Sequence, residues 1–244
     1  QLERVLPDGS CELIINLREE PRHIFDSATH QPRQGFRRSW FSGPHSRFIV
    51  IDTARDASLI GAHFKPGGAS EFFGAPLHEM RNSVIELDAI WNGKAQSLRD
   101  QLLDAPGAAA KFDLFELALI EQWNRATSRH RAISYALTRF TREPHTVTIG
   151  KVTEEIGLSA RRFIEVFAAQ VGMTPKVFCR VQRFQRALTA IQQRREVIWT
   201  QVALDCGYYD QAHFIQDFKE FCGLTPGDYL NRRPEYMNFV PIDS

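Results

Sequence analysis

The sequence lacks the short motifs by which many enzymes hold a nucleotide, a metal ion or an activated nucleophile. It has no phosphate-binding G-x-x-x-x-G-K-[ST] loop, no G-x-G-x-x-G after a strand and no G-x-S-x-G turn. The histidines of the first half form neither an H-x-H nor an H-E-x-x-H pattern and lie scattered at positions 23, 30, 45, 63 and 78. We therefore assign no catalytic residues, metal ligands or cofactor, and we expect that the protein is not an enzyme.

Cysteine is also scarce. The four cysteines form no C-x-x-C pair and have no histidines at zinc-finger spacing; they lie at positions 11, 179, 206 and 222. This pattern predicts buried, reduced thiols, as in a reducing compartment. Redox sensing is the alternative, and no motif supports it.

Long hydrophobic runs are absent. No run approaches the roughly 18 apolar residues of a membrane span, and the first residues lack the layout of a signal peptide. We therefore expect a soluble, cytoplasmic protein with no membrane partner. Because the chain begins with glutamine instead of methionine, we also expect that N-terminal residues are missing.

The chain carries no large excess of either charge, since 30 Lys and Arg nearly balance 29 Asp and Glu. This balance hides an asymmetry between two halves of a chain whose 244 residues are enough for two domains. Residues 125–234 hold 17 basic and 10 acidic side chains, a net of +7, whereas residues 1–124 hold 13 and 17, a net of −4. Such a basic segment is typical of a protein in which one domain binds a polyanion.

The second half contains a duplication. The stretch 158–175 recurs 51 residues later as 209–226, and the two copies align without a gap. Both copies carry F-I-x-x-F and both end in Gly-x-Thr-Pro, at Gly172 and Gly223. Two copies favour paired modules over a stacked solenoid, which needs three or more.

Each copy follows a short apolar run that ends in glycine, at Gly157 or Gly207, which indicates a short helix with a left-handed stop. Ser159 and Asp210 then stand as N-cap candidates ahead of phenylalanines four residues apart on one helical face. Helix, tight turn and helix in this order predict a helix-turn-helix, whose second helix enters the DNA major groove. Two ordinary helical hairpins are the alternative, and the repeat argues against them.

One amphipathic helix is predicted between the copies, beginning at Pro175, a favourable residue for a first helical turn. About 17 helical residues at roughly 1.5 Å each span about 25 Å. This connector can hold two recognition helices about one duplex turn, near 34 Å, apart. One protomer can therefore read two successive groove segments.

Residues 207–229 read GYYDQAHFIQDFKEFCGLTPGDY, and the first copy shares this pattern more loosely. This segment resembles the AraC/XylS-type transcription regulators, whose second helix-turn-helix follows G-F-x-D-x-S-H-F-x-x-x-F-K-x-x-x-G-x-T-P-x-x-Y. The matching positions are Gly207, Tyr208, Asp210, His213, Phe214, Phe218, Lys219, Gly223, Thr225, Pro226 and Tyr229. The resemblance covers roughly residues 146–232 and implies a DNA-binding domain.

The resemblance and the helical geometry together select the side chains expected to face DNA. The base-reading candidates are Arg161, Ile164, Glu165, Gln211, Ala212, His213 and Gln216. The phosphate candidates, for which salt bridges are the alternative, are Lys176, Arg180, Arg183 and Lys219. Glu165 and Gln216 stand where the family usually has arginine. A carboxylate accepts from cytosine N4 but repels phosphate, so the first module reads an unusual base, binds weakly, or carries Glu165 as a solvated helix residue.

The first half is predicted to be a small β domain followed by helices. PDGSCELIINL, RFIVIDTA and SLIGAHFKP indicate strands, and ASEFFG, KAQSLRDQLLDA, KFDLFELALIEQWNRATS and HRAISYALTRFTREP indicate helices. The segment up to Trp91 resembles a truncated cupin-like domain of unknown function, which by analogy senses a small molecule or mediates dimerisation. His63 and Trp40, with the phenylalanines at 41, 64, 72 and 73, are candidates for an apolar pocket. Core packing is favoured for these aromatics, so the ligand-binding residues stay unknown.

These observations predict an α+β fold with an N-terminal small β-barrel or sandwich and a C-terminal all-α domain of two helix-turn-helix motifs joined by a long helix. The predicted boundaries are 1–90 for the β domain, 91–143 for a helical connector, 144–234 for the DNA-binding domain and 235–244 for a tail. The expected function is transcription regulation through double-stranded DNA, modulated by a small-molecule effector. A homodimer and RNA polymerase are further candidate partners. The alternatives are a protein-interaction module that has lost strong DNA binding, and an enzyme joined to a DNA-binding half.

Overall fold

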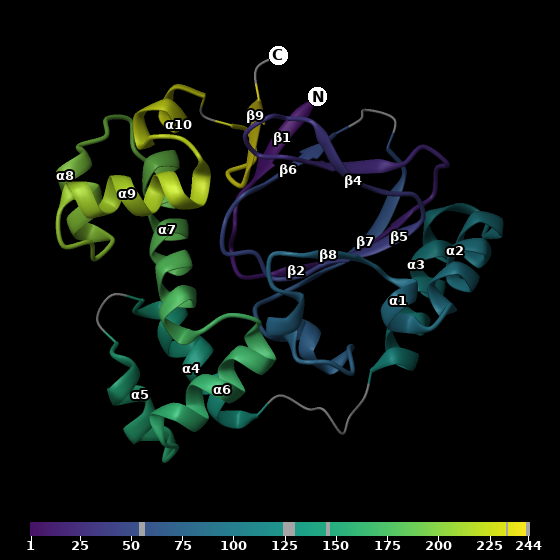
Figure 1. Cartoon of the computed structure of the whole chain (residues 1–244), viewed down its shortest axis with the longest axis horizontal. Coiled ribbons are helices and arrows are strands. Elements are labelled where there is room, and N and C mark those ends of the chain that lie inside the picture. The colour runs from purple at the N-terminus through teal and green to yellow at the C-terminus, as the bar shows by residue number, and fades with distance from the viewer. Residues whose placement is uncertain (54–56, 124–129, 145–146, 233, 243–244) are drawn as a thin grey trace.

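The computed structural model describes residues 1–53, 57–123, 130–144, 147–232 and 234–242, and it has a β-rich half beside a helical half (Figure 1). The strands are β1 (Leu2–Val5), β2 (Cys11–Asn16), β3 (Arg22–Phe25), β4 (Pro32–Phe36), β5 (Ser39–Ser42), β6 (Ile49–Asp52), β7 (Leu59–Phe64), β8 (Val84–Glu86) and β9 (Phe239–Ile242). The helices are the short 3-10 turns η1 (Gly68–Glu71) and η2 (Leu77–Met80), then α1 (Asp88–Trp91), α2 (Lys94–Asp104), α3 (Gly107–Gln122), α4 (Arg131–Arg142), α5 (Ile149–Ile156), α6 (Ala160–Val171), α7 (Pro175–Gln193), α8 (Trp199–Asp205), α9 (Gln211–Cys222) and α10 (Pro226–Arg232).

The strands form two antiparallel sheets, ordered β4-β3-β6-β1-β9 and β7-β2-β5-β8. Because side chains alternate along a strand, β2 turns Leu13 and Ile15 to one face, where they join a core with Leu98 of α2. Its other face, with Glu12 and Ile14, lines a cavity of the β-rich half. The predicted α+β architecture is confirmed, and helices α1 to α3 lie beside the β-rich half (Figure 1).

Three of the strands were predicted from their apolar runs, namely β2, β6 and β7. The remaining strands have only three to five residues each and little alternation of apolar and polar side chains. The segment ASEFFG forms a single 3-10 turn, η1, instead of a longer helix. The last residues of KFDLFELALIEQWNRATS, 124–129, lie outside the described residues.

The C-terminal segment returns to the first sheet. Residues 235–244 were predicted as a tail, but Phe239–Ile242 forms β9, which pairs antiparallel with β1 from Leu2↔Ile242 to Val5↔Phe239. Pro241 is tolerated there because β9 is an edge strand, with one side free of ladder hydrogen bonds. The two ends of the described chain therefore lie side by side (Figure 1).

Local sequence signals set the ends of the two helix-turn-helix motifs, α5-α6 and α8-α9. Ser159 and Asp210 cap α6 and α9 by accepting hydrogen bonds from backbone N–H groups three residues ahead. Gly157 ends α5 with a φ of 67°, and Thr174 caps α7 ahead of Pro175. The phenylalanines predicted to be core are buried in both modules, and one cluster joins the two modules through α7.

The β-rich half contacts both modules and the helix between them. A side chain on Gly172, at the end of α6, would overlap Pro44, and one on Gly223, at the end of α9, would meet the ring of Phe48 at 2.6 Å. The duplicated glycines are therefore the points where one loop, residues 43–48, packs against the two modules. In the part of the chain that the structure describes, no helix is long and apolar enough to cross a membrane.

Candidate nucleic-acid interface and ligand pocket

The open face of α6 carries the base-reading candidates of the first module. The Arg161 side chain is 91% exposed, and its Nε donates to Oε1 of Glu165 at 3.1 Å. Glu165 also lies 3.8 Å from the Arg162 guanidinium, so two arginines balance its charge within the helix. Ile164 is exposed on the same face. These three candidates share one solvent-facing surface, as the helical spacing predicts.

The open face of α9 carries the candidates of the second module. Ala212 and Gln216 are exposed, while Gln211 and His213 are half-buried at the first turn. Nε2 of His213 lies 3.9 Å from Oδ1 of Asp217, one turn later on the helix. Side-chain amides can read adenine bidentately, and Gln216 is free to extend from this face.

A buried carboxylate ties α9 to α7. Asp217 is only 3% exposed, and its Oδ1 lies 2.7 Å from the Arg180 guanidinium, which also contacts Glu220 at 2.5 Å. Arg183 lies 3.8 Å from the second Asp217 oxygen and stacks on the ring of Tyr208. The hydrogen bond that Arg180 donates to Asp217 raises the pKa of Arg180 above its usual value, so this guanidinium stays charged.

These contacts give Arg180 and Arg183 the salt-bridge role that was the alternative to phosphate contact, and their contact with DNA stays a prediction. Lys176 and Lys219 are exposed and can reach a phosphate. Sequence reasoning missed Asp217. Its position three residues after one core phenylalanine and next to another places it on the buried face, and that spacing could have revealed it.

The β-rich half encloses a cavity of about 460 Å³ lined by both sheets and by residues of β9. That volume suits a small molecule, since ligand pockets usually measure about 300 to 1,000 Å³. Its walls are mostly apolar, with contributions from Ile14, Ile24, Phe36, Trp40, Ile49, Ile51, Leu59, Val84 and Phe239. Of the aromatic candidates only Trp40 lines it, together with His63, while the phenylalanines at 41, 64, 72 and 73 pack in the core as favoured.

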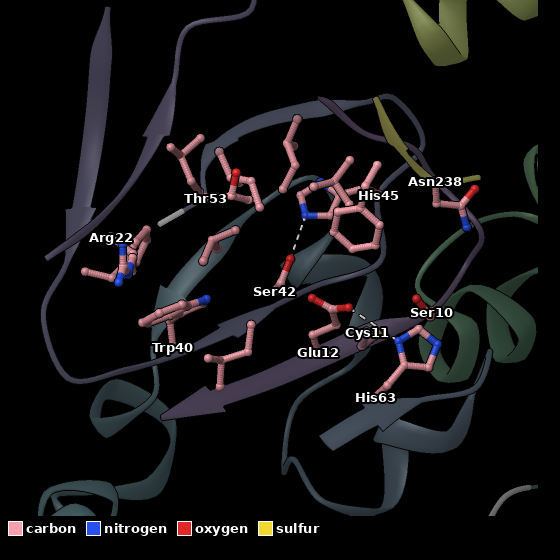
Figure 2. A pocket seen from close by; sticks show the side chains of 18 of the residues that line it. Ser10, Cys11, Glu12, Arg22, Trp40, Ser42, His45, Thr53, His63 and Asn238 are labelled. Carbon is pink, nitrogen blue, oxygen red and sulfur yellow. Dashed lines mark hydrogen bonds and ion pairs between the residues drawn. The ribbon is translucent and has the colours of Figure 1, made fainter. Parts of the chain in front are cut away.

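The cavity has two chemically different ends (Figure 2). Arg22 and Trp40 are drawn at one end, and at the other His63 lies 3.4 Å from Glu12. Between them, Nε2 of His45 is 3.0 Å from the Ser42 hydroxyl. Burial lowers the pKa of His45 from 6.5 to about 4, so its ring is neutral near pH 7.

One wall of the cavity, formed by β9 and the turn after β1, also packs against the helical half. Along β9, Phe239 lines the cavity, whereas its neighbour Val240 joins the core cluster of the helix-turn-helix modules. On the adjoining turn, the carbonyls of Pro7 and Asp8 accept hydrogen bonds from Gln185 and Gln182 of α7, at 2.8 and 3.0 Å. The cavity wall and the connector helix α7 are therefore in direct contact. No sequence pattern foretold this wall, because its residues come from both ends of the chain.

All four cysteines are free thiols. Cys11, Cys206 and Cys222 are buried, as predicted, and Cys179 is half-buried. Burial raises the pKa of each thiol above its usual value. Among the described residues, no group of three or more His, Cys, Asp or Glu side chains is placed to hold a metal ion.

Two family models match the chain. Residues 152–232 match a helix-turn-helix domain, and residues 1–86 match a domain of unknown function (DUF6597). The first covers both helix-turn-helix motifs except the first three residues of α5, and the second covers the β-rich half without β9. Neither model includes the helices α1 to α4 between them.

The chain is similar to named transcriptional regulators. It is 30% identical over 112 residues to an "Uncharacterized HTH-type transcriptional regulator" of Haemophilus influenzae, covering 46% of this chain and 37% of that protein. It is 26% identical over 113 residues to the "HTH-type transcriptional regulator ArgR" of Pseudomonas aeruginosa, covering 45% and 33%. The chain thus spans about a third of the length of these relatives.

A solved structure shows a further likeness. It is described as a transcriptional regulator, among the AraC-type DNA-binding domain-containing proteins, from Chromobacterium violaceum. The identity is 21% and the TM-score 0.40, over 43% of this chain and 94% of that one.

Proposed function

Because residues 152–232 match a helix-turn-helix domain and resemble the AraC/XylS-type regulators, we propose that the protein regulates transcription by binding duplex DNA through both modules. The observation that carries this proposal is the pairing of two capped recognition helices, α6 and α9, at opposite ends of α7. The 19 residues of α7 extend over about 28 Å at 1.5 Å each, which suits helices placed about one duplex turn apart.

The exposed side chains of both helices support base reading. Arg161 suits guanine, and Gln211 and Gln216 suit adenine, through bidentate hydrogen bonds. Lys176 and Lys219 supply charge for phosphates, and the β-rich half packs against the opposite side of the modules, at Gly172 and Gly223. The recognition faces thus stay open to a duplex.

The alternative, a protein-interaction module without strong DNA binding, rests on Glu165. Its ion pair with Arg161 would have to open for that arginine to reach a base. Exposed pairs four residues apart on a helix contribute only about 0.3 to 0.5 kcal/mol. A bidentate contact with the correct base is worth about 1 to 3 kcal/mol. The arginine therefore gains more from guanine than it loses from Glu165, and the DNA-binding proposal is favoured.

The cavity of the β-rich half is the proposed effector site. Its wall shares β9 with the core of the helical half, and Pro7 and Asp8 hold the connector helix. An effector that binds one arrangement of this wall better than another shifts the equilibrium between the corresponding arrangements of the modules. The free energy of that shift is at most the difference between its binding free energies for the two arrangements. We also propose that the protein lies in the cytoplasm, because that compartment holds the DNA in bacteria.

A homodimer is the proposed assembly, and α3 is the surface proposed for it. This helix exposes Phe112, Leu117 and Ile120, each more than half accessible, next to the exposed Trp123. Large exposed apolar side chains that gather in a patch mark interaction sites in soluble proteins, and α3 offers several of them for a dimer contact. A contact of this protein with RNA polymerase stays a prediction from the family resemblance alone.

The test is selection of bound sequences from random duplex DNA, followed by affinity measurements on the selected site. Two motifs with centres about 10 base pairs apart are expected if both modules read. Gln211→Ala should relax the preference at one base pair by about 1 to 3 kcal/mol, whereas Lys219→Ala should weaken all sequences alike and reduce the salt slope by about 0.9. Gln101→Ala, an exposed glutamine of α2, is the matched control and should change neither.

Two results would contradict the proposal. One is a selection without enrichment at any salt concentration, which leaves the interaction module as the better reading. The other is an equal loss of affinity for every sequence in Gln211→Ala, which removes the base-reading role of α9.

A further inference from the structure

A single cationic side chain lines the apolar end of the cavity without a partner. Arg22 lies on β3, and its side chain and that of Trp40 both line this part of the cavity (Figure 2). Its Nε is buried and donates no hydrogen bond. Among the described residues, no hydrogen bond or ion pair involves the Arg22 side chain. Arg22 as a whole is half-buried, but a buried N–H donor without a partner costs free energy.

Arg99, a buried arginine that packs against the same domain, is fully paired. Arg99 of α2 is 4% exposed, and its Nε donates to the Asn16 carbonyl at 2.7 Å. A terminal nitrogen of the same group donates to the Arg18 carbonyl at 3.0 Å and to the Glu19 carboxylate at 2.7 Å. Arg99 therefore holds the fold together. Among the described residues, Arg22 makes no comparable hydrogen bond to the fold, and its side chain lines the cavity.

The acidic groups near Arg22 are engaged elsewhere. Asp52, on the neighbouring strand β6, accepts a hydrogen bond from the His23 backbone N–H at 2.7 Å and lies 3.8 Å from the His23 ring. Glu12 lies near His63, at the other end of the cavity (Figure 2). None of these carboxylates lies within ion-pair distance of the Arg22 guanidinium.

We propose that the cavity binds a small organic monoanion, whose carboxylate or similar acidic group pairs with Arg22 and whose apolar body lies against Trp40, Ile14 and Ile49. This inference rests on the proposed function only in naming the molecule as the effector. A guanidinium and a carboxylate fit each other bidentately, and the pairing supplies the hydrogen bonds that Arg22 lacks. The apolar walls supply the affinity for the remainder of the ligand.

The far end of the cavity sets the charge of the ligand to one. Asp8 and Glu12 lie there, and Asp8 accepts hydrogen bonds from the backbone and the hydroxyl of Ser10. A second anionic group at that end would face these two carboxylates and be repelled. A hydroxyl or amine could instead donate to them. The far end of the cavity therefore favours ligands with one negative charge over dianions.

A pair of fluorescent dyes tests this proposal on the whole chain without DNA. The probes are 8-anilinonaphthalene-1-sulfonate and N-phenyl-1-naphthylamine, which share the apolar rings and differ by the anionic group. Arg22→Met should weaken the sulfonate dye about tenfold or more and change the uncharged dye less than about threefold, because one charge-assisted contact is lost. Arg22→Lys keeps the charge and should retain most of the difference between the dyes.

Three controls make the result decisive. Binding of the uncharged dye reports that Arg22→Met still folds with its cavity intact. Arg81→Met removes an exposed positive charge near η2 and should leave both dyes unchanged. Ile14→Phe narrows the cavity and should weaken both dyes if they bind there.

The proposal is overturned if Arg22→Met affects both dyes equally or neither, or if Ile14→Phe leaves both unchanged. Because DNA is absent from the assay, its outcome is separate from that of the proposed function. A chain that binds the anion through Arg22 but no DNA keeps this inference and loses the proposed function. A chain that binds DNA but no anion keeps the proposed function and loses this inference.

Discussion

The close approach of Gly172 to the β-rich half gives a sharp prediction about how the two halves are joined. Gly172 ends α6 in the left-handed conformation, with a φ of 84°. A Cβ at this position would overlap Cγ of Pro44 and lie 3.2 Å from the carbonyl oxygen of Leu77 in η2. Both neighbours are stiff, since one belongs to a proline ring and the other to the backbone. Gly172→Ala should therefore push the loop at Pro44 away from the first module.

Two separate costs make up the expected loss of stability. An alanine in the left-handed region costs about 1 to 2 kcal/mol. Overpacking at a tight contact costs about 1 to 3 kcal/mol more. Gly157→Ala isolates the first cost, because Gly157 also ends a helix with a positive φ, 67°, and has nothing within 4 Å of its added Cβ. The difference between the two variants measures the contact between the halves.

Urea unfolding followed by tryptophan fluorescence measures both variants. We expect Gly157→Ala to lower the free energy of unfolding by about 1 kcal/mol, the cost of the strained backbone. Gly172→Ala should lower it by about 2 to 5 kcal/mol, because the overlap adds to that strain. If the two variants lose equal stability, Pro44 does not pack on the first module as described. The reasoning about the junction then fails, whatever the DNA affinity.

Two further predictions concern buried charge. The pKa of His45 is lowered to about 4 in the fold, so as pH falls below 6.5 the unfolded chain takes up a proton before the folded chain does. The contribution of neutral His45 to the free energy of unfolding is therefore present above pH 6.5 and is lost below it. Between pH 7.5 and 4.5 the free energy of unfolding should fall by about 2.5 kcal/mol. Urea unfolding of His45→Gln at both pH values should lack this fall, and an unchanged fall would assign it to other groups. Asp217→Asn should cost about 2 to 3 kcal/mol, because Arg180 and Arg183 lose a buried partner, whereas Glu220→Gln should cost less than 1 kcal/mol; equal losses would contradict the role of Asp217.

The helix-turn-helix motifs could be predicted from the sequence because their signals are local. Ser159 and Asp210 cap their helices through atoms three residues away, and Gly157 stops its helix by its own backbone conformation. The phenylalanines then follow from helical spacing alone. Each inference needs fewer than a dozen consecutive residues, so a single sequence is sufficient.

The cavity could not be predicted in this way. Its walls combine Val5, Arg22, Trp40, Ile51 and Phe239, which come from five strands. Several of these strands are too short for alternation to be visible, and β9 contains a proline. Arg22 in particular looks like any surface arginine in the sequence. Only the three-dimensional arrangement reveals that none of the residues the structure describes pairs with its side chain.

The pairing of β1 with β9 also determines when the first sheet can be completed during synthesis. Leu2 pairs with Ile242, so one edge of β1 stays without its hydrogen-bonding partner until β9 has left the ribosome. Contacts this distant in sequence close late and slow folding. An unpaired edge is a template for pairing with other chains. The β-rich half is synthesised first, but the open edge of β1 is covered by β9 only after the helix-turn-helix modules have been synthesised. Until then this edge can pair with other chains.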